Sequence, residues 1–141
     1  MTSFPDSVTT VGPFAFMDSS VSISDTNNVT LLDSQAFRSC RNITSFTIRS
    51  KCKFTGNGLF EDCINLETVT FEQGPGPELS FYNEGSWSDG MFVNTKITKL
   101  DLPERITNLG NASLNCDTLR TLIIRRNTPP QKGLWSLNEY V

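Results

Sequence analysis

Cysteine is the most reactive side chain in this sequence, and three of the four cysteines recur at one position of a repeated pattern. Cys40, Cys63 and Cys116 each stand three residues after the same slot of that pattern. A nucleophilic thiol ordinarily needs a base such as histidine beside it, and the chain of 141 residues contains no histidine. Zinc is disfavoured for the same reason, and because no C-x-x-C spacing occurs.

The repetition of the cysteines also bears on disulfides. Equivalent positions of stacked repeats form a column in which neighbouring strands lie about 4.8 Å apart. A disulfide instead brings two Cβ atoms to about 3.8 Å, pointing toward each other. We therefore expect buried, reduced thiols that pack as small apolar groups, with a disulfide framework and a zinc site as the alternatives. Cys52 stands outside the column, and we expect it to be partly exposed.

Paired acidic and basic residues offer little catalytic chemistry. The neighbours Glu61 and Asp62, and likewise Glu104 and Arg105, fit solvated surface charge better than general acid–base catalysis. The sequence contains no Walker loop, no G-x-S-x-G elbow, no H-E-x-x-H and no D-x-D-x-D-G calcium loop. We therefore predict a protein that is not an enzyme and that uses no cofactor and no metal.

The strands that position these residues are predicted by an L-x-x-L-x-L pattern that occurs four times. Its copies are Ile43-x-x-Phe46-x-Ile48, Leu66-x-x-Val69-x-Phe71, Ile97-x-x-Leu100-x-Leu102 and Leu119-x-x-Leu122-x-Ile124. A second phrase ends at Phe16, Phe37, Phe60, Phe92 and the equivalent Ser113. The gaps between these ends are 21, 23, 32 and 21 residues. A period in the low twenties is that of leucine-rich repeats, and about nine residues are inserted after Phe60.

Each copy is too short to bury its own apolar side chains, so the copies must stack as coils of a solenoid. The last two apolar residues of the pattern share one face of a short strand, and we expect these strands to form one continuous parallel sheet. The second phrase supplies another extended stretch and a tight, 3₁₀ or short helical turn. We predict a single leucine-rich-repeat domain over 1–141 with about five units, the first degenerate, and a cap or domain edge over 127–141.

Side chains between the apolar positions point out of this sheet, where a ligand could meet them. Four charged residues on that side are candidate ligand contacts: Arg49, Glu72, Lys99 and Arg125. The inserted segment 73–90 is rich in Gly and Pro, which predicts a loop, and insertions in repeat arrays often lie on the binding face. Its aromatic residues Phe81, Tyr82 and Trp87 either contact a ligand or fold back over an apolar edge of the array.

The segment from Ala36 to Ile48 resembles the unit of the BspA-type leucine-rich repeat family, A-F-x-x-C-x-x-L-x-x-I-x-L-P. The segment from Leu59 to Val69 matches the same unit, and looser matches bring the resemblance to about residues 5–130. This resemblance implies a module of the kind found in bacterial surface and secreted proteins, linked to adhesion and to binding of proteins or matrix. It implies no shared catalytic residue.

From the pattern and the resemblance we predict a binding module that recognises a protein or glycan ligand in an adhesion-like role, using the exposed sheet and the 73–90 loop. The alternative is a structural or assembly element that self-associates, or stacks on neighbouring domains, through the open ends of the array. The resemblance implies a secreted or cell-surface location. No signal peptide is visible at the N-terminus, which we attribute to a trimmed leader.

The composition excludes two classes of partner. The net charge is -3 and the pI about 4.9, whereas nucleic-acid binding needs a dense face of Lys and Arg. The short basic runs near Arg49 and Arg125 fit solvated surface better than a phosphate-binding face. No apolar run approaches the ~18 residues needed to cross a bilayer, so we expect no membrane insertion.

Overall fold

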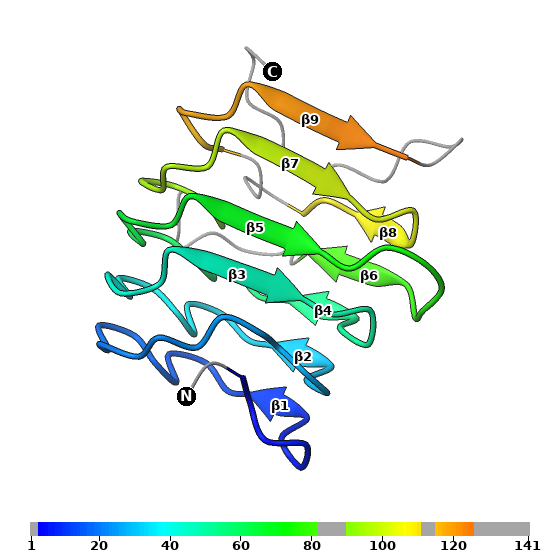
Figure 1. The fold of residues 1–141 in the computed structure, drawn as a ribbon, viewed down its shortest axis with the longest axis horizontal. Helices are drawn as coiled ribbons and strands as arrows, with labels where there is room; N and C mark the ends of the chain where they lie inside the picture. The colour runs from blue at the N-terminus through cyan, green and yellow to red at the C-terminus, as the bar shows by residue number, and fades with distance from the viewer. Residues whose placement is uncertain (1–2, 82–89, 111–114, 126–141) are drawn as a thin grey trace.

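The computed structural model describes residues 3–81, 90–110 and 115–125. These residues form a solenoid of stacked coils with nine short strands and, in this described part, no helix, so no helix there could cross a membrane (Figure 1). The strands are β1 (Thr10–Val11), β2 (Leu31–Leu32), β3 (Ser45–Ile48), β4 (Phe54–Thr55), β5 (Thr68–Phe71), β6 (Leu79–Phe81), β7 (Lys99–Leu102), β8 (Ile106–Asn108) and β9 (Thr121–Ile124).

The strands lie on two faces of the solenoid. The front sheet, which we define as β3, β5, β7 and β9, is built from the L-x-x-L-x-L copies. The back sheet has five parallel strands in the order β1-β2-β4-β6-β8, and it is the second extended stretch that the sequence predicts. Single bridges from Ser3 to Asp25 and from Asp25 to Thr47 continue the front column toward the N-terminus.

The apolar positions of the pattern meet in register inside the solenoid. Phe46 pairs with Val69, and Leu100 pairs with Leu122. Phe46 is 1% exposed and Leu100 is fully buried, while Leu122 is partly buried against the same core. The prediction of stacked coils that share one apolar interior is therefore confirmed.

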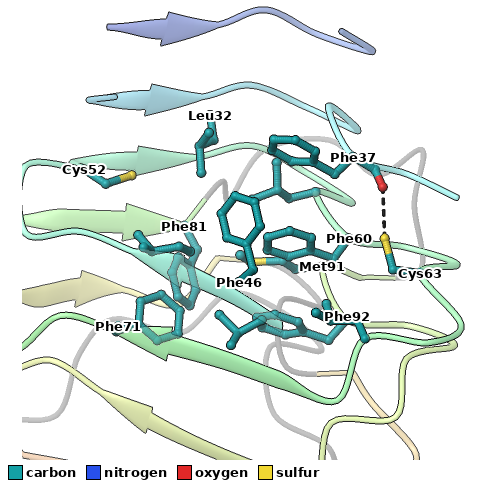
Figure 2. Packing of buried hydrophobic residues seen from close by; sticks show 14 of the residues in the cluster. Leu32, Phe37, Phe46, Cys52, Phe60, Cys63, Phe71, Phe81, Met91 and Phe92 are labelled. Carbon is teal, nitrogen blue, oxygen red and sulfur yellow. Dashed lines mark hydrogen bonds between the residues drawn. The ribbon is translucent and has the colours of Figure 1, made fainter. Parts of the chain in front are cut away.

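Phenylalanine rings at the end of the second phrase form a column through the core (Figure 2). Phe37 stacks on Phe16 with ring centroids 5.5 Å apart and on Phe60 at 5.8 Å, and Phe60 stacks on Phe92 at 6.1 Å. Phe46 lies edge-on to Phe60 at 4.9 Å. Rings of successive coils thus carry the packing along the solenoid axis, which suits the preferred geometry of aromatic pairs.

The turns after the back strands are tight turns rather than helices. Backbone N–H groups bond three residues back, as from Cys40 to Phe37 at 3.2 Å and from Cys63 to Phe60 at 3.0 Å. In each of the first three turns two residues have left-handed backbone, as Gln35 (φ 55°) and Ser39 (φ 59°) do in the second coil. A helix cannot run through left-handed residues of this kind, so the chain turns back toward the front sheet after one short segment.

All four cysteines are free and buried, so the prediction of buried thiols is confirmed. The Cys63 Sγ donates to the Phe37 carbonyl at 2.9 Å (Figure 2), and the Cys40 Sγ donates to the Phe16 carbonyl at 3.0 Å. Each thiol of this column therefore bonds to the preceding coil. The expectation that Cys52 is partly exposed is wrong, because its side chain is fully buried.

Burial of the thiols leads to a first testable outcome. It raises the pKa of Cys63 to about 12 and that of Cys52 to about 11, so little thiolate is present near pH 8. We expect the native protein to react with an aromatic disulfide reagent only as fast as it unfolds, and the denatured protein to release all four thiols at once. Rapid labelling of any one cysteine in the native protein would contradict this burial.

Two expectations about the front sheet and the insertion are wrong. The front sheet is not continuous, because β3 pairs with β5 and β7 with β9, while β5 and β7 are not hydrogen-bonded as a ladder. The inserted segment 73–90 is not all loop, because Leu79–Phe81 forms β6 and pairs with β4 in the back sheet. Residues 82–89, with Tyr82 and Trp87, lie outside the described residues.

The register of β6 shows where the extra residues enter. Phe54 pairs with Ser80, and Ile48 pairs with Phe71, so the link from front to back strand is three residues longer in this coil than in the one before. The remainder of the insertion follows β6. The back sheet stays continuous across this coil, whereas the front sheet opens.

Candidate functional site

A groove of about 390 Å³ lies on the front sheet where β5 and β7 run side by side without a ladder. We call it the β5–β7 groove. Its walls come from both strands and the residues next to them: Glu67, Thr68, Val69, Thr70, Phe71, Gln73, Thr98, Lys99 and Asp101. Polar and apolar atoms contribute almost equally to its lining, so it offers hydrogen-bonding groups above an apolar floor.

The backbone around the groove explains why it is open. In the other two strand pairs the first residue of the later strand donates to the carbonyl just before the earlier strand, as from Thr68 to the Thr44 carbonyl and from Thr121 to the Thr98 carbonyl. Between β5 and β7 the described backbone instead makes one bond outside the strands, from Lys96 to the Leu66 carbonyl at 2.8 Å. At the far end, the Gln73 side-chain amide bridges the Phe71 and Asp101 carbonyls at 3.2 and 3.4 Å.

Arg105 supports the lengthened turn next to the groove. Its guanidinium donates to the Cys52 carbonyl at 3.0 Å and to the Arg49 carbonyl at 3.2 Å, which lie two coils away. Gly76 lies between Ser50 and the Arg105 side chain, where a Cβ would meet the Ser50 carbonyl oxygen at 2.5 Å. Burial lowers the pKa of Arg105, and its Nε has no hydrogen-bond partner among the residues that the structure describes. Arg105 therefore ties the coils together across the insertion through backbone carbonyls rather than through a carboxylate.

Three of the four charged candidates lie in ion pairs at the ends of the front strands. Arg49 contacts two carboxylates. Its Nε lies 3.0 Å from an Asp25 oxygen, and its Nη1 lies 3.0 Å from a Glu72 oxygen. The Arg49 hydrogen bond lowers the pKa of Asp25, while the Ser50 hydroxyl and Arg49 together lower that of Glu72. Partial exposure of these pairs limits their contribution to stability.

Arg125 repeats the Arg49 arrangement on the other side of the groove. Its guanidinium holds the Asp101 carboxylate through two bonds at 2.6 and 2.7 Å and lowers the pKa of that carboxylate. Lys99, the fourth candidate, is exposed on β7 and lines the groove, and none of the ion pairs between described residues involves it. Lys99 is therefore a cation in the groove wall outside these ion pairs, whereas Arg49, Glu72 and Arg125 are each held in one.

The aromatic candidates divide differently. Phe81 is 1% exposed and packs on Phe71 with ring centroids 5.9 Å apart, so its ring belongs to the core and is not available to a ligand. For this residue the fold-back alternative holds. Tyr82 and Trp87 lie outside the described residues, and their role stays a prediction.

Of the residues that line the groove, the sequence identifies Lys99 as a candidate contact but not Thr68, Thr70, Thr98 or Gln73. The signal that could have located them is the gap of 32 residues between Phe60 and Phe92, because the strands on either side of an insertion are the ones that lose their register. Among the described residues no group of His, Cys, Asp and Glu could hold a metal ion.

Comparison with known proteins agrees with this architecture. The family described as BspA type leucine rich repeat region matches residues 1–86 and 77–130, with six copies of the repeat. No curated protein and no solved structure matched the sequence. The family match spans nearly the whole chain, and the stacked coils, parallel strands and buried repeat positions are those of such a solenoid. The chain therefore belongs to the BspA-type leucine-rich repeat family.

Proposed function

We propose that this protein is a non-enzymatic recognition module that binds a protein ligand on its front sheet, with the β5–β7 groove at the centre of the contact. Leucine-rich repeats of this family are in general protein-interaction scaffolds. The observation that carries the proposal is the groove itself: an opening in an otherwise paired, exposed sheet, with Lys99 and three threonine side chains on its walls.

The chemistry of the groove favours recognition of polar, extended partners. Threonine hydroxyls both donate and accept hydrogen bonds, and the Lys99 ammonium suits a carboxylate of the ligand. The ion pairs of Arg49 and Arg125 flank this patch and fix its edges. A protein loop fits this mixture of polar rim and apolar floor, and a glycan is the other ligand class that such hydroxyl-rich walls accommodate.

The family's usual occurrence in surface and secreted proteins supports an adhesion-like role at the cell surface. In that setting the front sheet would bind a host or matrix protein. Tyr82 and Trp87 of the inserted segment stay candidate ligand contacts, because aromatic side chains supply large contact area in recognition.

The test screens the purified protein against immobilised matrix proteins and a glycan array, then compares variants. We expect Lys99→Glu and Thr70→Trp, which reverse the charge and fill the groove, to weaken binding about tenfold or more. Lys53→Glu is the matched control, since Lys53 is also exposed but precedes β4 of the back sheet. It should leave the affinity within about twofold of wild type.

Each result of the screen decides a different part of the proposal. A protein hit that is weakened by the groove variants and not by the control supports it. A glycan hit with the same variant pattern keeps the site and replaces the ligand class. A ligand whose affinity is indifferent to both groove variants, or the absence of any hit, would reject the groove as the binding site.

A further inference from the structure

Two strand edges face each other inside the β5–β7 groove, because β5 is paired with β3 and β7 with β9 but not with each other. On β5, the Thr68 N–H donates toward β3. Backbone groups alternate in direction along a strand, so the N–H and C=O groups of Val69 and Phe71 point toward β7. On β7, the same alternation turns the backbone groups of Lys99 and Asp101 toward β5.

The chain itself fills the far end of this gap with a side-chain amide. The Gln73 Nε2 donates to the Phe71 carbonyl on the β5 edge at 3.2 Å and to the Asp101 carbonyl on the β7 edge at 3.4 Å. One amide nitrogen thus serves two acceptors that a regular ladder would supply with backbone donors. At the other end the Lys96 N–H donates to the Leu66 carbonyl at 2.8 Å.

These two closures decide what kind of group can enter the gap. An inserted strand would hold β5 and β7 about 9.6 Å apart, twice the spacing of neighbouring strands. It would therefore have to break the direct bond from Lys96 to Leu66 and displace the Gln73 amide. A single side chain can enter between the two closures and leave both intact.

Between the closures the groove presents both donors and acceptors. Val69 and Lys99 turn backbone N–H and C=O groups into it from opposite strands. The hydroxyl-bearing residues Thr68, Thr70 and Thr98 line its walls. A primary carboxamide carries N–H donors and a carbonyl acceptor in one plane, so it can bond to both strand edges at once. A carboxylate only accepts hydrogen bonds and an ammonium only donates them, so each would serve half of these groups.

We propose that the protein ligand of the β5–β7 groove inserts an asparagine or glutamine side chain between the two strand edges, beside Lys99. The inserted carboxamide donates to a carbonyl of one strand, as the Gln73 amide does at the far end, and accepts from an N–H of the other. This mode of binding rests on the recognition function proposed for the same groove and names the group that reaches its floor.

The first test uses propionamide, a free primary carboxamide, as the probe. It is titrated into the isotope-labelled protein and followed by NMR at the backbone amides of Val69 and Lys99. We expect saturable shifts there, with an affinity about fivefold or more above that of N,N-dimethylpropionamide, which keeps the carbonyl and lacks the donors. The amide of Thr47, on the paired strands β3 and β5, should not move. Equal affinities for the two probes, or equal shifts at Thr47, would overturn the proposal.

Gln73→Ala gives this titration an internal reference. The variant empties the far end of the gap, so propionamide should shift the amides of Glu72 and Leu102, which follow the two bridged carbonyls. The same amides should stay unmoved in the wild type, where Gln73 occupies that place. A variant without these shifts would show that the gap does not admit a free carboxamide, and would overturn the proposal.

A loop library displayed on yeast tests the proposal with protein ligands. We expect selection on the wild-type protein to enrich loops that carry Asn or Gln at one fixed position. Replacing that residue by Leu or Met, which have similar size, should weaken binding about tenfold. Loops that Lys99→Glu weakens but that show no preference for Asn or Gln would overturn the carboxamide and leave the groove as the binding site. Loops whose binding is indifferent to Lys99→Glu would reject the groove itself.

Discussion

Gly56→Ala is expected to lower the free energy of unfolding by about 3 kcal/mol, although it adds a single methyl group. A Cβ at Gly56 would lie 2.2 Å from the Ser34 nitrogen and 2.5 Å from the Asp33 carbonyl carbon. These are backbone atoms of the preceding coil, and they cannot move aside as the end of a side chain could. The Gly56 N–H also donates to the Leu32 carbonyl at 2.6 Å, which holds the two coils at this spacing.

Gly12→Ala is the control for this substitution because Gly12 holds the same position in the first coil and has open space around its Cα. We expect it to change stability by no more than about 0.5 kcal/mol. Urea unfolding followed by circular dichroism, at a protein concentration below any self-association, measures both variants. Equal midpoints for Gly56→Ala and Gly12→Ala would show that the coils are not packed as closely as described.

Phe60→Ala is expected to cost about 4 kcal/mol, the range for deleting a large ring from a close-packed core. Phe60 is fully buried and contacts three other rings, on Phe37, Phe46 and Phe92. Because the rings of successive coils stack on one another, the cavity would separate the N-terminal coils from the rest of the array. We therefore expect a broader, less cooperative urea transition as well as a lower midpoint.

Phe14→Ala provides the comparison for Phe60→Ala with the same change of residue. Phe14 is half exposed on the turn of the first coil, and its loss should alter stability by at most about 0.5 kcal/mol. A large effect at Phe14 together with a small one at Phe60 would contradict the assignment of the ring column to the core.

Much of the fold could be predicted from the sequence because the same apolar positions recur in every copy of the repeat. Phe46, Val69 and Leu100 occupy one slot of the pattern, and a slot that is apolar in every copy has to face the shared interior. The cysteine column follows by the same logic, since Cys40 and Cys63 fill equivalent places against the preceding coil.

The parts that escaped prediction depend on single departures from the repeat. Leu79 and Phe81 alternate as a strand should, but the Gly and Pro residues before them are typical of a loop, and strand β6 was hidden by that signal. Cys52 could not be placed because no other copy has a cysteine there. Arg105 resembled surface charge, since nothing local reveals that it reaches the carbonyls of Arg49 and Cys52, two coils away.

The candidate site was predictable only in outline. The alternation of the strands identified the outward side chains of Arg49, Glu72, Lys99 and Arg125. Ion pairing with neighbouring coils then decides which of these charges are available to a ligand. Arg49 and Arg125 each have an acidic partner 24 residues earlier in the chain, one coil below, whereas Lys99 lies beside the interrupted ladder. Which residues of neighbouring coils lie beside each other depends on the length of the whole insertion, and no local motif in the sequence reveals it.

Residue-resolved amide hydrogen exchange by NMR tests the central claim, that stacked coils pair in parallel except between β5 and β7. The register directs the amides of Thr70 and Ile123 to the preceding strands β3 and β7, and the equivalent amide of Asp101 toward β5, with which β7 forms no ladder. We predict slow exchange at Thr70 and Ile123 and exchange at least tenfold faster at Asp101. Equal protection at all three would mean a continuous sheet without a groove, and rapid exchange at all three would mean that the coils do not stack.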